Sequence, residues 1–442
     1  MAQLSPDDQA RLGQVEDAVR THSRPSQLRI TDMRVAVVAS NYDYPIIRID
    51  TNQGVYGIGE VRDAGHKENA LQFKSVLLGQ NPCNVDMIFR AVKRFGSWGR
   101  EGGGVSGIEI ALWDLVGKVY GVPCYQLLGG KYRDRVRIYA DTPAPEEPTP
   151  DGYARRVRER RALGLTFIKF DIRPQLFEDV PGGTIGSPAR FEYDLGRHWR
   201  APGGGASVAL SDAGIARAVE VVAAVRAAVG WDVALCIDHF GHGHLAAKDV
   251  IRLGRALEPF GLAWIEDPVP WWDIAAHKQV TAALSVPTAA GEELYLWDGF
   301  RELIEQRAVD IIHPDLLTAG GLVETKKIAD YAERYGLPTA LHFAGSPIAF
   351  MANLHCAAAI PSLVALEHHG LDLPFWRDIV RGLPEDYLQD GYVAVPETPG
   401  LGVDLNLEGI AANLRAGGLF EPTEEWNTPK LGFWQPDRRW DR

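Results

Sequence analysis

Three acidic residues, Asp238, Glu266 and Glu292, each stand where a short apolar run ends. The runs read VALCID, LAWIED and PTAAGEE, and the acids follow one another at intervals of 28 and 26 residues. Each run is too short for a helix, and each interval suits one strand plus one helix, so the pattern predicts parallel strands with their carboxyl ends at one edge. Any one of these acids could simply cap the next helix. Three together would repel one another, and a hard cation such as Mg²⁺ removes that conflict.

The alternation of strand and helix continues beyond these three runs and predicts an α/β fold. After Gly130, eight candidate strands alternate with helical patterns, which favours a (β/α)₈ barrel. The candidate strands end near Asp141, Asp171, Asp238, Glu266, Ala290, His313, His342 and Glu367. The stretch 174–210 is rich in Gly, Pro and Arg and interrupts the rhythm, so we expect an inserted loop over the carboxyl-terminal rim of the barrel.

The rest of the chain divides around this barrel. Residues 1–26 are polar and form an N-terminal extension, and residues 27–132 combine three strand-like runs with helices in a small α+β domain. The barrel is expected over 133–390. Residues 391–442 contain GYVAVPETPGLGVDLN, which we interpret as a strand pair returning to the N-terminal domain.

Charge and composition exclude several classes of protein. The net charge is −12 without a basic stripe, so nucleic acid is not an expected partner. No segment approaches 18 apolar residues, and the N-terminus lacks an apolar signal region, so we expect neither membrane insertion nor export. Four widely spaced cysteines are interpreted as reduced core residues of a cytoplasmic protein.

A carboxylate and an imidazole follow at the next two predicted strand ends. Asp315 comes 23 residues after Glu292, and His342 comes 27 residues after Asp315. If both lie at the rim, the carboxylate orients one ring nitrogen and leaves the other for proton transfer. A histidine buried in the core is the competing interpretation of His342. Its predicted place beside three acids favours the catalytic one.

These motifs together resemble those of the mandelate racemase group of the enolase superfamily. The similar stretches are SGIEIALWDLVGKVYGVPCYQLLGG, CID, WIEDP, AAGEE, HPDLLTAGGL, LHF, ALE and GYVAVPETPGLGV, and the resemblance covers essentially residues 28 to 410. The resemblance implies a modified barrel, (β/α)₇β, with an N-terminal α+β capping domain that the C-terminal segment completes. It also implies one Mg²⁺ per subunit, with Mn²⁺ as a substitute, and a homo-oligomer between a dimer and an octamer.

The resemblance also assigns roles to residues. Asp238, Glu266 and Glu292 would bind the metal, Asp315 and His342 would form the catalytic dyad, and Glu367 would act as hydrogen-bond donor or acid. Capping-domain loops near 41–44 and 62–67 would close over a small carboxylate substrate. The shared chemistry is removal of a proton from the carbon next to that carboxylate, with a Lys or His base working beside Mg²⁺.

One departure from the family pattern decides which reaction we expect. The second barrel strand reads FIKFDIRP, where racemases of the group carry Lys-x-Lys. Lys169 matches the first lysine, and Asp171 replaces the second. Inversion of a carbon needs a base on each side, so loss of one base favours elimination. We therefore expect a hydro-lyase that dehydrates an aldonate or aldarate to a 2-keto-3-deoxy acid, with Lys169 neutralising the substrate carboxylate.

Other interpretations stay open at this point. A racemase, epimerase or cycloisomerase could use Asp171 or His242 as its second base, and a catalytically silent sugar-acid-binding protein is a third alternative. Asp171 could also pair with Lys169 or Arg173, and the three histidines of IDHFGHGH could suggest zinc, although carboxylates are the clearer ligand set. The candidate substrate contacts are Asp171, Arg173, His242, His198 and Tyr42.

Overall fold

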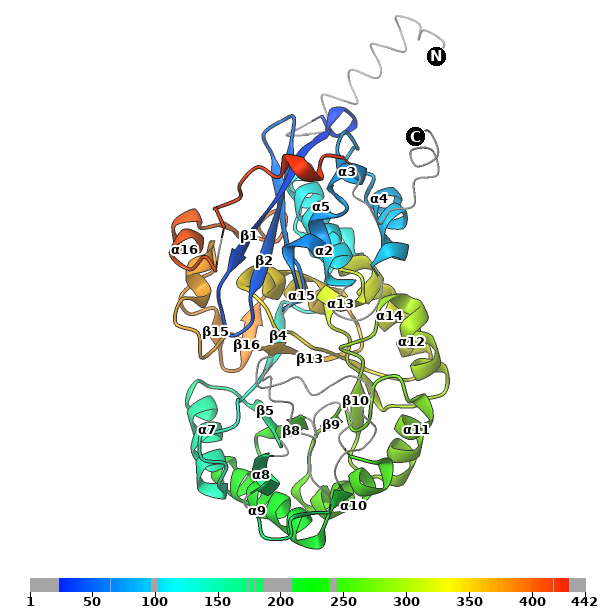
Figure 1. The fold of residues 1–442 in the computed structure, drawn as a ribbon, viewed down its shortest axis with the longest axis vertical. Helices are drawn as coiled ribbons and strands as arrows, with labels where there is room; N and C mark the ends of the chain where they lie inside the picture. Colours follow the sequence, from blue (N-terminus) through cyan, green and yellow to red (C-terminus); the bar gives the residue numbers. More distant parts are fainter. Residues whose placement is uncertain are drawn as a thin grey trace, which may run out of the picture.

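The computed structural model shows two domains in contact, an upper α+β domain and a lower barrel (Figure 1). It describes residues 24–63, 65–96, 102–172, 175–178, 180–185, 209–238, 245–415 and 417–428. The predicted (β/α)₇β barrel with an N-terminal capping domain is confirmed by this architecture.

The capping domain is built on a three-stranded antiparallel sheet. Its strands are β1 (Ile30–Val38), β2 (Tyr44–Thr51) and β3 (Tyr56–Glu60), paired in that order. Its helices are α2 (Lys67–Leu71), α3 (Lys74–Leu77), α4 (Val85–Val92), α5 (Gly103–Tyr120) and α6 (Cys124–Leu127). Helix α5 is buried along most of its length because it lies between the sheet and the barrel.

Strand β3 packs directly on the backbone of helix α5. A Cβ atom at Gly57 would come within 2.0 Å of the Ala111 carbonyl oxygen, and one at Gly59 within 2.1 Å of that of Gly107. Only glycine therefore fits at these two positions. The close contact fixes where strand β3 ends, which matters because the residues that follow it reach the barrel.

The barrel is a closed ring of parallel strands. In ring order they are β4 (Arg135–Ala140), β5 (Phe167–Asp171), β8 (Ala234–Asp238), β9 (Ile265–Glu266), β10 (Thr288–Ala290), β11 (Ile311–Ile312), β12 (Thr339–Leu341) and β13 (Leu363–His368), and β13 pairs with β4. The connecting helices are α7 (Pro150–Ala162), α9 (Asp212–Val229), α10 (Ala247–Leu257), α11 (Ile274–Ala283), α12 (Leu296–Glu305), α14 (Leu322–Arg334) and α15 (Pro347–Ala359). They surround the strands in Figure 1.

The insertion between β5 and β8 is described only at its two ends. Helix α8 (Gln175–Glu178) begins it, and strands β6 (Thr184–Ile185) and β7 (Ala209–Leu210) pair antiparallel with each other. The insertion therefore leaves and rejoins the barrel as a strand pair, directly before helix α9.

The C-terminal segment contacts both domains. The Gly400 carbonyl accepts from the Cys124 amide at 3.0 Å, and Asp404 accepts from the Tyr56 hydroxyl of β3 at 2.6 Å, so this stretch reaches the N-terminal domain as expected, while its strands pair with barrel elements. Strand β16 (Tyr392–Ala394) pairs antiparallel with barrel strand β4 and with β15 (Leu388–Gln389), and β17 (Asp404–Leu405) pairs with β14 (Val380–Arg381). Beyond helix α16 (Leu407–Ala412) the chain also bridges the capping sheet, where Leu414 pairs with Val38. Sequence pattern identified these strands but not their partners, because β16 pairs with residues 135–137 at the amino end of β4, outside the residues of β4 that pair within the ring.

Two buried glutamates of the capping domain bind the amino ends of barrel helices. Glu60 accepts a hydrogen bond of 3.0 Å from the Ser346 amide, which begins α15. Glu109 accepts bonds from the amides of Leu322 (2.8 Å) and Val323 (3.0 Å), the first turn of α14. Carboxylates are stabilised at helix amino ends by free N–H groups and by the helix dipole. These hydrogen bonds join the capping domain to the barrel.

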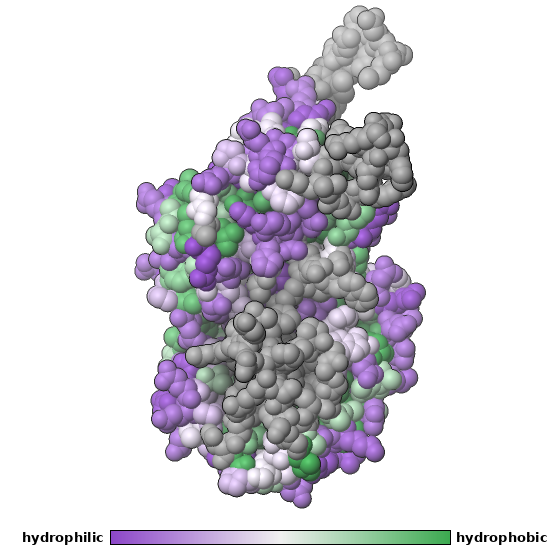
Figure 2. Space-filling view, viewed as in Figure 1, coloured by the Kyte–Doolittle hydropathy of each residue, from purple (hydrophilic) through white to green (hydrophobic). Residues whose placement is uncertain are grey.

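In the described part of the chain, no helix has the length and hydropathy needed to cross a bilayer. On the face shown in Figure 2, hydrophilic residues cover most of the coloured surface, and hydrophobic residues form small separate patches.

Candidate active site

The floor of the candidate site is one apolar side chain from each barrel strand. These side chains form a buried cluster inside the ring: Tyr139, Phe167, Cys236, Trp264, Ala289, Ile311, Ala340 and Ala365. Side chains alternate between the two faces of a strand, so the residue two positions further on also faces inward. Those next positions are Asp141, Lys169, Asp238, Glu266, Gly291, His313, His342 and Glu367. The period of the strands thus places seven ionisable side chains and one glycine, Gly291, directly above an apolar floor.

Lys169 lies at the centre of the acids of this ring. Its ammonium group is 2.9 Å from Asp238 Oδ2, 3.1 Å from Glu266 Oε1 and 2.6 Å from Glu367 Oε1. Burial disfavours the charged amine, but these three carboxylates outweigh it and raise the pKa of Lys169 well above its usual value. Burial and the neighbouring Asp238 raise the pKa of Glu266 well above its usual range. The positive charge of Lys169 therefore does not fully offset the repulsion between the carboxylates of Asp238 and Glu266.

The predicted dyad is present at the ends of strands β11 and β12. His342 Nδ1 donates to Asp315 Oδ2 at 2.7 Å, while the other oxygen, Oδ1, accepts from the amides of Leu317 (2.7 Å) and Thr318 (3.2 Å). The start of helix α13 (Leu316–Ala319) therefore fixes the carboxylate that orients the ring. Burial opposes the imidazolium, but Glu292, whose Oε2 is 2.7 Å from Nε2, and Glu367 hold the pKa of His342 well above its usual value.

A residue of the capping domain completes this dyad. The guanidinium of Arg62, two residues beyond strand β3, forms an ion pair with Asp315 Oδ2 and lies 3.1 Å from His342 Nδ1. Its Nε is 2.8 Å from Asp63 Oδ1, and the side chain is fully buried. Because arginine only donates hydrogen bonds, Arg62 and the histidine share the same carboxylate oxygen. The sequence placed Arg62 only in a loop near substrate, not against the dyad.

A second network holds Glu367 in place. Glu367 Oε2 accepts from the Tyr139 hydroxyl at 3.0 Å and from the Phe343 amide at 3.1 Å. The same hydroxyl is 2.5 Å from His313 Nε2. Burial and the neighbouring His342 hold the pKa of His313 well below its usual value, so its ring is neutral. Tyr139 and His313 were not predicted as site residues, although each occupies an inward strand position that the sequence period identifies.

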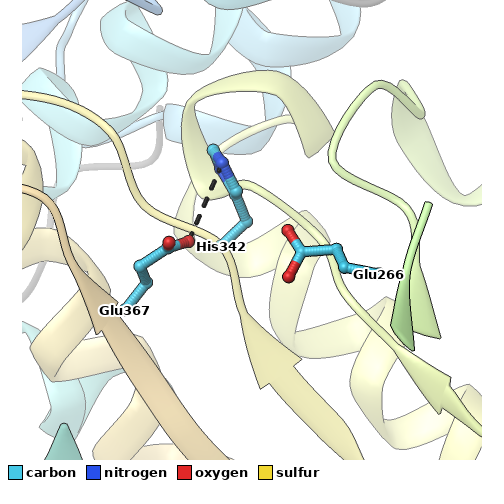
Figure 3. Close-up of side chains that lie close together, drawn as sticks. All are labelled: Glu266, His342 and Glu367. Carbon is cyan, nitrogen blue, oxygen red and sulfur yellow. Dashed lines mark ion pairs between the residues drawn. The ribbon is translucent and has the colours of Figure 1, made fainter. Parts of the chain in front are cut away.

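The donor set of the three predicted metal ligands fits Mg²⁺. Asp238, Glu266 and Glu292 follow three successive strands, and all offer carboxylate oxygens, the ligands that hard cations prefer. The structure brings a different set of ligand atoms together. Among the described residues, one ligand atom each of Glu266, His342 and Glu367 lies within 4.8 Å of the other two (Figure 3). The difference arises because Glu292 pairs with His342 and Asp238 with Lys169. Imidazole ligands are typical of softer metals than Mg²⁺. A metal bound to His342 would also prevent this residue from acting as the base.

The predicted substrate contacts are only partly described. Asp171 is buried at the end of β5, paired in register with Asp238, and Tyr42 is half-buried between β1 and β2. Arg173, His198 and His242 lie outside the described residues. Their predicted roles, including the alternative zinc site, stay predictions.

Family models match both domains. Residues 14–129 match the mandelate racemase/muconate lactonizing enzyme N-terminal domain, and residues 152–409 match the enolase C-terminal domain-like model. The chain is 39% identical over 397 residues to a D-xylonate dehydratase of Haloferax volcanii, covering 88% of this chain and 89% of that protein. It is 31% identical to a D-mannonate dehydratase of Caulobacter vibrioides, covering 87% and 94%.

Solved structures show the same relationship. A mandelate racemase/muconate lactonizing enzyme-like protein from Rubrobacter xylanophilus superposes with a TM-score of 0.77 at 33% identity, covering 89% of this chain and 99% of that one. Both domains, the order of the barrel strands and the sequence motifs therefore agree with one family. The chain belongs to the mandelate racemase/muconate lactonizing enzyme family of the enolase superfamily.

Proposed function

We propose that this protein is a Mg²⁺-dependent dehydratase that converts a sugar acid, an aldonate or aldarate, to a 2-keto-3-deoxy acid. The observation that carries the proposal is the His342–Asp315 dyad, held 2.7 Å apart beside the carboxylates at the barrel mouth. Support comes from the relatives, which are named as D-xylonate, D-galactonate, D-gluconate and D-mannonate dehydratases.

The metal would be held by Asp238, Glu266 and Glu292. When bound, Mg²⁺ supplies positive charge that stabilises the anion forming at the substrate carboxylate. Lys169 lies within ion-pair distance of two of these ligands, so its ammonium group is placed to neutralise the same carboxylate. The proposal takes Mg²⁺ as the native ion and Mn²⁺ as a substitute.

The protein's own groups then move the protons. His342 Nε2, in its neutral form, removes the proton from C2, and the electron pair of the broken C–H bond moves into the carboxylate to give an enediolate. The pair then forms the C2–C3 double bond as the C3–O bond breaks. The imidazolium donates its proton to the departing hydroxyl, which leaves as water. Asp315 stabilises the imidazolium and fixes its orientation, and Glu367, which Tyr139 and Lys169 hold, faces the developing enol. The enol then converts to the 2-keto-3-deoxy acid.

The isomerase alternative requires a second base opposite His342. Asp171 occupies that strand position, but a carboxylate buried beside Asp238 is a much weaker base than the lysine of the racemases. A single histidine that serves first as base and then as acid suits elimination. We also infer a cytoplasmic homo-oligomer, and the four free cysteines support a reducing compartment.

The test is turnover of aldonic and aldaric acids with Mg²⁺, assayed for 2-keto-3-deoxy products. We expect at least one acid to be dehydrated and His342→Asn to lose about 10²- to 10⁴-fold in kcat, the usual contribution of a general base. Asp86→Asn, which changes an exposed carboxyl group on helix α4 of the capping domain, is the control and should keep full activity. Inverted substrate without any keto acid would refute dehydration.

A further inference from the structure

A second imidazole–carboxylate pair lies at the barrel mouth, on strands that the proposed mechanism does not use for proton transfer. Strands β13 and β4 run parallel with Glu367 opposite Tyr139 and His368 opposite Ala140. His369 and Asp141 are therefore the next opposed positions, and the Asp141 amide donates to the His368 carbonyl at 3.2 Å. Alternation places both side chains on the inner face, one inward position above Glu367 and Tyr139.

The pair is well oriented and charged. His369 Nε2 lies 3.1 Å from Asp141 Oδ2, and the Asp141 side chain is 8% exposed. Burial opposes both charges, but the attraction between them raises the pKa of His369 and holds that of Asp141 below its usual range. The imidazolium thus has two N–H donors, of which Asp141 uses one.

The side chain of His369 is partly exposed, directly after the carboxyl end of strand β13. Its side chain keeps 18% of its surface exposed, and among the described residues Asp141 is the only hydrogen-bond or ion-pair partner the structure gives it. Its ring lies 5.9 Å, centre to centre, from that of Tyr42, in the capping-domain loop between β1 and β2. The neighbouring His368 differs: it is fully buried on the outer face of the strand, and both its nitrogens are hydrogen-bonded.

The position of the pair suggests what it contacts. In the proposed function the substrate carboxylate binds near Lys169 and the acids of strands β8, β9 and β10. Strands β13 and β4 lie across the ring from β9 and β10, and His369 stands above Glu367 and beneath Tyr42. A sugar acid anchored at its carboxylate would extend its remaining carbons toward this upper layer, where a hydroxyl oxygen can accept from Nδ1.

We propose that His369, oriented by Asp141, binds a hydroxyl group of the sugar acid beyond the two reacting carbons and so selects acids with a longer polyhydroxy chain. This inference rests on the proposed function, because it takes the substrate to be a sugar acid. His369 is here a specificity-determining residue and takes no part in bond breaking.

The test compares two acids that differ only in this distal part. D-Xylonate carries hydroxyls beyond C3, whereas glycerate ends at the β-hydroxyl. Dissociation constants are measured by calorimetry with Mg²⁺ in the His342→Asn background, so that substrate is not consumed. His369→Phe should weaken xylonate binding about 10- to 100-fold, the loss expected for one hydrogen bond from a charged donor, and leave glycerate binding unchanged. His369→Asn, which keeps an amide donor near Nδ1, should recover part of the loss.

His368→Gln is the control on the same strand. It should lower the melting temperature without changing the ratio of the two dissociation constants. An equal loss for both acids in His369→Phe, or no loss for either, would overturn the inference. If the His342→Asn parent binds glycerate but no five- or six-carbon acid, the proposed function itself fails, an outcome that differs from either result of the His369 comparison.

Discussion

Arg62 of the capping domain forms a buried ion pair with Asp315 of the barrel. The same Asp315 oxygen accepts from His342, so one carboxylate joins the proposed base to the neighbouring domain. The proposed catalytic dyad therefore has its full set of contacts only when the two domains are docked. Strand β3, which ends two residues before Arg62, is fixed in turn by its glycine contacts with helix α5.

Replacement of Arg62 should damage both stability and catalysis. Arg62→Met leaves buried carboxylates without their counter-charge, which typically costs about 3–5 kcal/mol of unfolding free energy. The change is measured by urea denaturation together with turnover. Arg90→Met, which removes an exposed helical pair with Asp86, is the control and should leave the denaturation midpoint unchanged. Equal midpoints for the two variants would contradict the buried role of Arg62.

Lys169→Met should abolish most activity while the protein stays folded. The ammonium group is the common partner of Asp238, Glu266 and Glu367, and it is the proposed counter-ion of the substrate carboxylate. We expect kcat/KM to fall about 10²- to 10³-fold, as when one preorganised electrostatic contact is removed. Lys131→Met, at a surface ion pair with Asp134, is the control. A variant with unaltered kcat/KM would exclude Lys169 from substrate binding.

Glu109 should make stability depend on pH. Burial raises its pKa from 4.5 to about 8, although the amides of Leu322 and Val323 favour the anion. Between these values the folded chain keeps a proton that the unfolded chain releases. The contribution of Glu109 to the unfolding free energy is therefore fully present below pH about 4.5 and is lost as pH rises through about 8. The slope of this loss is at most about 1.4 kcal/mol per pH unit.

Glu109→Gln removes that titration and should make the unfolding free energy depend less steeply on pH between pH 5 and 8, as measured by denaturation at several pH values; Glu60, whose pKa burial also raises to about 8, keeps its own share of the slope. Glu408→Gln, an exposed residue of α16, should leave the slope as it is. An unchanged slope in Glu109→Gln would show that the carboxylate is ionised throughout this range.

Removal of metal should stop turnover completely and reversibly. EDTA is expected to abolish product formation, and Mg²⁺ should restore it, because the three oxygen ligands suit a hard cation. Glu292→Gln should raise the Mg²⁺ concentration needed for half-maximal activity. Glu293→Gln, one position further along the chain, should not. Turnover that survives exhaustive chelation would contradict the proposed metal site.

The inner ring of the barrel could be predicted because it follows local rules. Asp238, Glu266 and His342 each stand two residues beyond an apolar floor residue, and a period of two is visible in the sequence. The same rule places Tyr139 and His313 on the inner face. It does not show that Tyr139 contacts Glu367, because these residues lie on the first and last strands of the barrel, which meet only when the ring closes.

Contacts between the domains could not be predicted in this way. Arg62 and His342 are 280 residues apart, and Glu109 and Leu322 are 213 apart, and no periodicity relates them. The same reason applies to strand β16, whose pairing with the amino end of β4 depends on how the C-terminal segment folds back onto the barrel. Local pattern identified the strands and their inward residues. The contacts that bring these residues together into a site depend on packing between segments that are far apart in the sequence.

The central claim is that His342 removes the C2 proton and that water is then eliminated, and the fate of solvent deuterium tests it most directly. The reaction is run in D₂O with Mg²⁺ and a sugar acid of the panel, and the product is examined by NMR. We predict a 2-keto-3-deoxy acid carrying one deuteron at C3, absent in His342→Asn. Recovery of the acid with deuterium at C2 and no keto product would contradict the claim.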